Sequence, residues 1–205
     1  MARTDTQARA VAADRLTMFA DAVIAIALTL LALDLPVPSG ETTGAMLDSV
    51  WSHGKEYLAF VLSFTVIAAH WRAHHETFRY VGSLNNRLTS LTIAWLFMQV
   101  LMPFATRVLT AEGAFAPRFS LYALVQVLAS SLFALIVREV RRQHLVREDV
   151  LPRVFAESQL RSFCLAAMFA VSVPVAFLTS NAGAFACWIA IPLVLRIASR
   201  LQNRT

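Results

Sequence analysis

The chain is a succession of long apolar runs separated by short polar connections. A helix needs ~20 residues to cross the hydrocarbon core of a bilayer, and apolar runs of this kind can be placed six times. They fall at 16–36, 55–75, 88–109, 119–138, 160–180 and 184–201. The pattern therefore predicts an all-α, polytopic membrane protein with six transmembrane helices in a single domain, residues 1–205.

The first run, from Arg15 to Pro36, contains one deeply placed charge, Asp21. Because an ionisable side chain inside a membrane span is costly, we expect Asp21 to face protein and to pair with Arg15 or with His75 of the second run. At 100° per residue, Asp21 points roughly away from a narrow arc on the other side of the helix. That arc collects Ala22, Ile26, Thr29, Leu30 and Leu33. A face of this composition fits lipid contact, bundle packing or the wall of a narrow hydrophobic pore.

Composition and charge support a membrane location. Hydrophobic residues make up 58% of the chain, which excludes an ordinary soluble domain. Of the 18 Lys and Arg residues, Lys55, Arg107 and Arg118 lie on one side of the predicted spans and the remaining fifteen lie on the other. The positive-inside rule then predicts a multi-pass protein of the cell membrane with both termini in the cytoplasm. This distribution also argues against a nucleic-acid partner.

A polar cluster of histidines closes the second run. His70 and His74 are helical i,i+4 neighbours, His75 follows directly, and Glu76 is the nearest carboxylate. Two histidines on one helix face are too few for zinc, which takes at least three protein ligands in its usual sites. The cluster is therefore either an interfacial belt of polar and aromatic groups or, as an alternative, the centre of a membrane metalloenzyme. We predict no bound metal.

Two connections carry further expectations. The loop from Val37 to Gly54 is rich in Pro, Gly, Ser and Thr, which predicts a flexible cap over the outer mouth. The linker at 138–161 is basic with interspersed apolar residues, and it fits either a helix on the anionic inner leaflet or a solvated connection. Cys164 and Cys187 lie within apolar runs, so we expect no disulfide.

The start of the first run has a recognisable motif. Arg15, Phe19 and Asp21, followed by Ala-Val-Ile-Ala-Ile-Ala-Leu-Thr, resemble the RxxxFSD signature of the transmembrane protein 175 potassium channel family. Ala20 stands where that family usually has serine, which removes one hydroxyl from the motif.

Two later segments extend the resemblance. The string WRAHHETF at 71–78 is similar to the family's W-x-x-H-H-x-x-F, and a Pro-Phe pair at 103–104 ends the third run, so the similarity covers 15–104. The resemblance implies that Trp71 and His75 turn inward and hydrogen-bond to the motif of the first run.

The resemblance also implies a function and an assembly. Prokaryotic family members are homotetrameric potassium channels in which the first span lines a central pore, and no TVGYG-like carbonyl filter is present in this chain. The family's hydrophobic constriction falls seven positions after Phe19, at Ile26, with Leu30 and Leu33 as the next two rings and Thr29 as the candidate for selectivity. We therefore expect a leak-type potassium channel that is not an enzyme, with no cofactor and with the lipid bilayer and potassium ions as its partners. The alternative to a channel or a metalloenzyme is a secondary transporter that uses Asp21.

Overall fold

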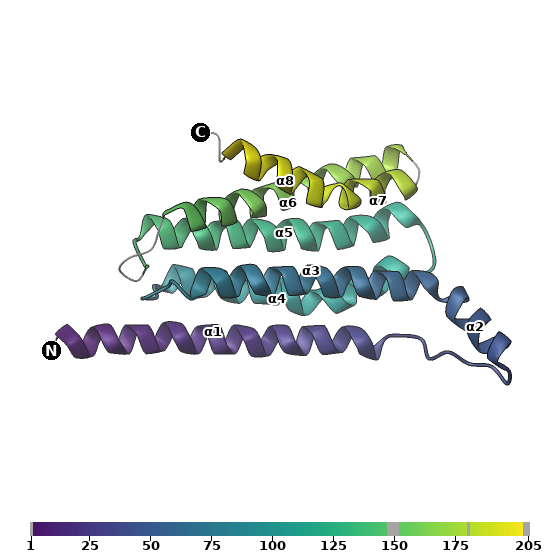
Figure 1. The fold of residues 1–205 in the computed structure, drawn as a ribbon, viewed down its shortest axis with the longest axis horizontal. Helices are drawn as coiled ribbons and strands as arrows, with labels where there is room; N and C mark the ends of the chain where they lie inside the picture. The colour runs from purple at the N-terminus through teal and green to yellow at the C-terminus, as the bar shows by residue number, and fades with distance from the viewer. Residues whose placement is uncertain (1, 147–151, 180, 203–205) are drawn as a thin grey trace.

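A computed structural model describes residues 2–146, 152–179 and 181–202, and its named elements are all α-helices. Their bounds are α1 Ala2–Leu33, α2 Thr43–Ser52, α3 Gly54–Phe78, α4 Asn86–Thr110, α5 Phe115–Arg142, α6 Pro152–Leu178, α7 Asn181–Ile189 and α8 Ile191–Gln202. The long helices lie side by side in layers, with α1 on one side, α3 and α4 next, then α5, and α6 to α8 on the far side (Figure 1). The start of α1 and the end of α8 lie at the same end of the bundle.

Four helices are long and apolar enough to cross a membrane within the described ranges. They are Val11–Leu33, Asn86–Thr110, Phe115–Arg142 and Ser158–Leu178. The protein is thus a mostly helical membrane protein. The helix α3 has 25 residues, but charges such as Lys55 and Arg72 make it less apolar than these four.

The sixth apolar run differs from its prediction because it is divided into α7 and α8. Ala190 separates the two helices, and its N–H still donates to the carbonyl of Ala186 at 3.0 Å. Pro192 is the second residue of α8, where its missing N–H removes no helical hydrogen bond. The division therefore reflects a proline that starts a new helical segment.

The packed side of α1 is an alanine-rich stripe. Its buried members recur at helical spacing, and they are Ala13, Ala20, Ile24, Ala27 and Leu31. This stripe packs against α3 and α4. Small side chains let helices approach closely in a bilayer, where packing rather than hydrophobicity drives association.

Buried hydroxyl groups join α3, α4 and α5 in the core. The Oγ1 of Thr106 lies 2.7 Å from the Oγ of Ser63, which lies 3.2 Å from the hydroxyl of Tyr122. All three side chains are buried. Because lipid tails offer no hydrogen bonds, such a chain of partners both satisfies these groups and fixes the register of three helices.

The outer connection contains more structure than we expected. The helix α2 forms within it, and Thr42 caps this helix by accepting a hydrogen bond from the N–H of Ala45 at 3.2 Å. The hydroxyl of Tyr57 also donates to the carbonyl of Pro36 at 2.7 Å. The connection is therefore a tethered helix rather than a flexible cap.

The basic linker at 138–161 is mostly the ends of α5 and α6, and its residues 147–151 lie outside the described ranges. In α5 the buried carboxylate of Glu139 accepts a hydrogen bond from the side-chain N–H of Asn85 at 2.9 Å. Arg87 completes this cluster, with its Nε 3.5 Å from Glu139. The described part thus belongs to the bundle.

Candidate functional site

The exposed face of α1 carries the residues that we expected at constrictions. Ile26 is 59% exposed, Leu33 78% and Leu30 39%, and Thr29 is exposed beside them. Phe19 lies on the same face, seven residues before Ile26 and therefore only about 20° away around the helix. Since these apolar side chains have no cover within the described chain, they face either lipid or another copy of the protein.

Thr29 presents an oxygen on this face. Its hydroxyl donates to the carbonyl of Ile26, one turn earlier in α1, at 2.8 Å. The proton is therefore committed to the helix backbone, whereas the lone pairs of the oxygen stay free to accept. An acceptor in this state can replace a water molecule around a cation.

Asp21 lies off this face and is held by α3. The indole Nε1–H of Trp71 donates to the Oδ1 of Asp21 at 2.9 Å. The Trp71 ring also contacts His75, with ring centroids 5.5 Å apart. The structure thus brings Asp21, Trp71 and His75 into one chain of contacts, although His75 makes no hydrogen bond to Asp21 in the described part of the protein.

Arg15, one of the two partners that we expected for Asp21, does not pair with it in the described part of the chain. Six helical residues separate the two, which turns Arg15 about 120° away around the axis and about 9 Å along it. Arg15 instead lies on the exposed face with Phe19 and Ile26, and its side chain is exposed. Any ionic partner of Arg15 must therefore come from outside the described chain.

The three histidines of α3 point in different directions. His74 is fully buried between Trp95, with ring centroids 4.9 Å apart and 5° between the planes, and Phe78, at 4.0 Å. The Nδ1 of His70 lies 3.2 Å from the amide nitrogen of Gln99. Among the described residues, no group of three His, Cys, Asp or Glu side chains is placed to hold a metal ion. The described residues therefore do not form the metal site that the metalloenzyme alternative requires.

Two ionic contacts escaped the sequence reasoning. At the far end of α1, the Oδ2 of Asp34 lies 3.5 Å from the Nε of Arg107 in α4. At the other end of the bundle, Glu139 holds Asn85 and Arg87, as described above. The only signal for either was that charges of opposite sign fall at, or directly beside, the ends of predicted spans on the same side of the membrane.

Comparison with known proteins shows what the residues of this site are similar to. The family model described as endosomal/lysosomal potassium channel TMEM175 matches residues 15–103. A potassium channel of Streptomyces collinus is 32% identical over 123 residues, which are 58% of this chain and 60% of the relative. A potassium channel of a Chryseobacterium species is 33% identical over 92 residues, 45% of this chain and 46% of the relative. The matches thus span about half the length of these bacterial relatives.

A vertebrate protein also matches about half of this chain. The endosomal/lysosomal proton channel TMEM175 of Gallus gallus is 35% identical over 109 residues, 49% of this chain and 22% of that longer protein.

Solved structures match over nearly the whole chain. The crystal structure of a lysosomal potassium-selective channel TMEM175 homolog from Chamaesiphon minutus superposes with a TM-score of 0.69 at 21% identity, covering 95% of this chain and 98% of that one. A variant of the potassium channel MtTMEM175 in complex with a nanobody fusion gives 0.63 at 15% identity, covering 93% and 94%. These likenesses concern the fold alone. The family model shows that residues 15–103, which include the uncovered face of α1 and Trp71, are similar to the TMEM175 family.

Proposed function

We propose that the protein is a leak-type, potassium-selective cation channel of the cell membrane, assembled as a homotetramer around the exposed face of α1. The observation that carries this proposal is the two-faced character of α1. One face packs against α3 and α4, and the other leaves Ile26, Leu30 and Leu33 uncovered. The relatives named as potassium channels support the same function.

The assembly follows from geometry. One copy of an exposed helix face encloses nothing, whereas several copies related by a symmetry axis enclose a channel along that axis. In this proposal α1, α3, α4, α5 and α6 each cross the membrane once and the α7 and α8 pair crosses it a sixth time. The start of α1 and the end of α8 lie at one end of the bundle, which is consistent with an even number of crossings (Figure 1). In the sequence, fifteen of the eighteen Lys and Arg residues fall in the segments predicted on the side of the two termini, which supports a cytoplasmic location for both termini.

The pore would be narrowed by side chains. Rings of Ile26, Leu30 and Leu33 form hydrophobic constrictions that pass or exclude hydrated ions according to their radius. The Thr29 oxygens lie among these rings, where they coordinate a potassium ion that has lost hydration water at Ile26. No cofactor is needed for such conduction, and the permeant ion is potassium.

Asp21 serves as an anchor in this mechanism. Its hydrogen bond from Trp71 ties α1 to α3 on the side away from Ile26. A transporter would need this carboxylate to be accessible to a proton or a sodium ion on the transport path. Since Asp21 lies off the uncovered face, its position favours a channel over a transporter.

Two measurements on purified protein test the proposal. The mass of the detergent-solubilised complex should equal four chains, and liposomes containing it should pass potassium down its gradient with no second solute present. A monomeric complex would contradict the shared pore. Flux that requires a counter-substrate would favour a transporter.

A further inference from the structure

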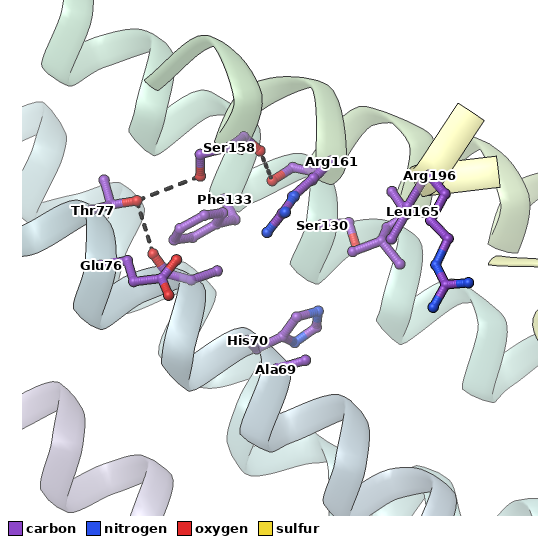
Figure 2. Close-up of a pocket in the computed structure, with 13 residues that line it drawn as sticks. Ala69, His70, Glu76, Thr77, Ser130, Phe133, Ser158, Arg161, Leu165 and Arg196 are labelled. Atoms are coloured by element: carbon purple, nitrogen blue, oxygen red, sulfur yellow. Dashed lines mark hydrogen bonds between the residues drawn. The ribbon is translucent and has the colours of Figure 1, made fainter. Parts of the chain in front are cut away.

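A cavity of about 340 Å³, lined in part by polar side chains, lies on the opposite side of the bundle from α1. It opens between α3, α5, α6 and α8 (Figure 2). Its polar wall includes His70, Ser130, Ser158, Arg161, Ser162 and Arg196. This wall is unexpected among membrane helices, where polar side chains are rare without a partner or a function.

The wall is built by regular helical spacing. Ser158, Arg161, Ser162 and Leu165 follow an i, i+3, i+4, i+7 pattern, which places all four on one face of α6. In α8 the cavity is lined by Leu195 and Arg196. Each of α6 and α8 thus brings one arginine and one leucine to the same space, and Figure 2 shows Arg161, Arg196 and His70 around it.

Several groups in the wall have unused hydrogen-bonding capacity. Ser130 is 2% exposed, and its Oγ has no hydrogen-bond partner. His70 is 7% exposed and uses its Nδ1 for Gln99, which leaves its Nε2 unpaired in the described part of the chain. Arg161 has neither an ion pair nor a side-chain hydrogen bond within the same ranges. Buried polar groups normally find partners, so the unpaired atoms of Ser130 and His70 indicate a missing one, whereas Arg161 is an exposed group at the same cavity.

The charge of the wall specifies the partner's chemistry. Glu76 is the acidic residue that lines the cavity, and its Oε1 is already engaged by the Nε of Arg72 at 3.0 Å. The other charged groups of the wall are the guanidinium ions of Arg161 and Arg196, and Arg196 also makes an interaction within the protein. Planar guanidinium donors with nearby hydroxyl donors match the oxygens of a phosphate.

We propose that this cavity binds the phosphate group of an anionic phospholipid. The cavity lies near the start of α6 and the end of α8, which is the cytoplasmic leaflet in the topology proposed above, and basic pockets between membrane helices on this side suit lipid headgroups. Leu165 and Leu195 supply an apolar border for the glycerol and the first part of the acyl chains. The site does not depend on the pore, because it lies on the far side of the bundle from α1.

Native mass spectrometry of the purified full-length protein in detergent tests this proposal, with phosphatidylglycerol and phosphatidylcholine as probes. Phosphatidylglycerol should bind more tightly than the zwitterionic lipid. Arg161→Gln should weaken its binding about tenfold, as expected for the loss of one charge-assisted hydrogen bond, and Ser130→Ala roughly threefold, as expected for a neutral one. Arg138→Gln is the matched control, since Arg138 is an exposed arginine near the same end of α5 that does not line the cavity.

The outcomes separate the proposal from its alternatives. Ser130→Ala should leave the lipid-free melting temperature unchanged, because the Oγ of Ser130 has no partner in the protein to lose, but it should reduce the stabilisation by phosphatidylglycerol. If Arg138→Gln and Arg161→Gln weakened phosphatidylglycerol binding equally, the binding would depend only on surface charge, and the proposed site would be wrong. Displacement of the lipid by inorganic phosphate at equal concentration would assign the cavity to the free anion instead.

Discussion

The exposed faces of α1 and α4 look alike in accessibility and differ in composition. Ile26 on α1 is 59% exposed, and Ile93 on α4 is 53% exposed. The exposed stripe of α4 is uniformly bulky, consisting of Ile93, Phe97, Val100 and Phe104. On α1 the bulky residues alternate with exposed small or hydroxyl-bearing ones, which are Ala22, Ala25 and Thr29. Small residues permit close helix approach, whereas a bulky stripe suits lipid tails. Exposure in a single copy therefore does not define the environment of a membrane helix, but side-chain size helps to do so.

The two helices also differ in how they are held. Of the most apolar window of α1 only 22% is buried, against 44% for α4. The polar groups of α4, such as Gln99 and Thr106, are buried in the core, whereas the anchor of α1 is the partly exposed hydrogen bond between Asp21 and Trp71. The helix α1 thus depends less on its own bundle, as expected of a helix that completes its packing against other copies.

The largest expected effect is a change in ion selectivity, tested by the same Ile→Asn substitution on the exposed face of α1 and on the exposed face of α4. Ile26→Asn should raise conductance and lower the potassium-to-sodium permeability ratio about tenfold, equivalent to ~1.4 kcal/mol of differential barrier, because a polar ring lets ions keep more hydration water. Ile93→Asn on α4 is the matched control and should leave the ratio unchanged. Reversal potentials in planar bilayers measure both. A loss of stability in Ile26→Asn with a wild-type ratio would make the α1 face a packing surface only.

The next effect concerns the anchor of α1. Trp71→Phe removes the donor to Asp21, and it should destabilise the protein by about 1 kcal/mol, the typical contribution of a hydrogen bond. Asp21→Asn retains a neutral acceptor and should cost less, with selectivity unchanged in both variants. Thermal unfolding in detergent measures the stability, and Phe97→Leu on the exposed stripe of α4 serves as control. Altered selectivity in Asp21→Asn would show instead that the Asp21 side chain lines the pore.

A smaller effect is expected at Thr29. Thr29→Val keeps the shape of the side chain but removes the oxygen, so the permeability ratio should fall roughly threefold, or about 0.7 kcal/mol, while the channel still conducts. Thr92 is the matched control, because its hydroxyl also donates to its own helix, to Leu88 at 2.9 Å, but is buried in the core. Thr92→Val should leave the ratio at its wild-type value. An equal change in both variants would assign the effect to helix packing.

The two faces of α1 could be predicted because the helical period is constant. Once Arg15 to Pro36 is taken as a helix, the angle of every residue follows, and the exposed set agrees with the expected arc. The same geometry argues against pairing Arg15 with Asp21. The contact between Asp21 and Trp71 joins residues 50 positions apart, and hydropathy carries no information on how two helices are rotated against each other.

The errors in the predicted fold have local causes. Hydropathy averages over long windows, so it missed the ten-residue α2 inside a polar connection, although Thr42 is a typical N-cap residue. It also merged α7 and α8, which together have the length of one span. The cavity beside Arg161 could not be predicted at all, because it requires four helices to converge.

The smallest effect is expected where the two helices meet, at the ion pair of Asp34 and Arg107. In the sequence alone, Asp34 suggests a negative charge that gathers cations at the outer mouth. The structure places Arg107 beside it, and the two charges largely cancel at a distance.

Asp34→Asn should therefore lower potassium conductance by less than about twofold, since exposed pairs contribute only ~0.2–1 kcal/mol. Arg107→Gln leaves Asp34 uncompensated and should raise conductance by a similar factor. Recordings at low and high salt test both, because the Debye length falls from ~30 Å at 0.01 M to ~3 Å at 1 M and should abolish the two effects at high salt. Changes of the same sign in both variants, or changes that persist at 1 M, would show that the pair acts by holding α1 against α4 rather than through its field.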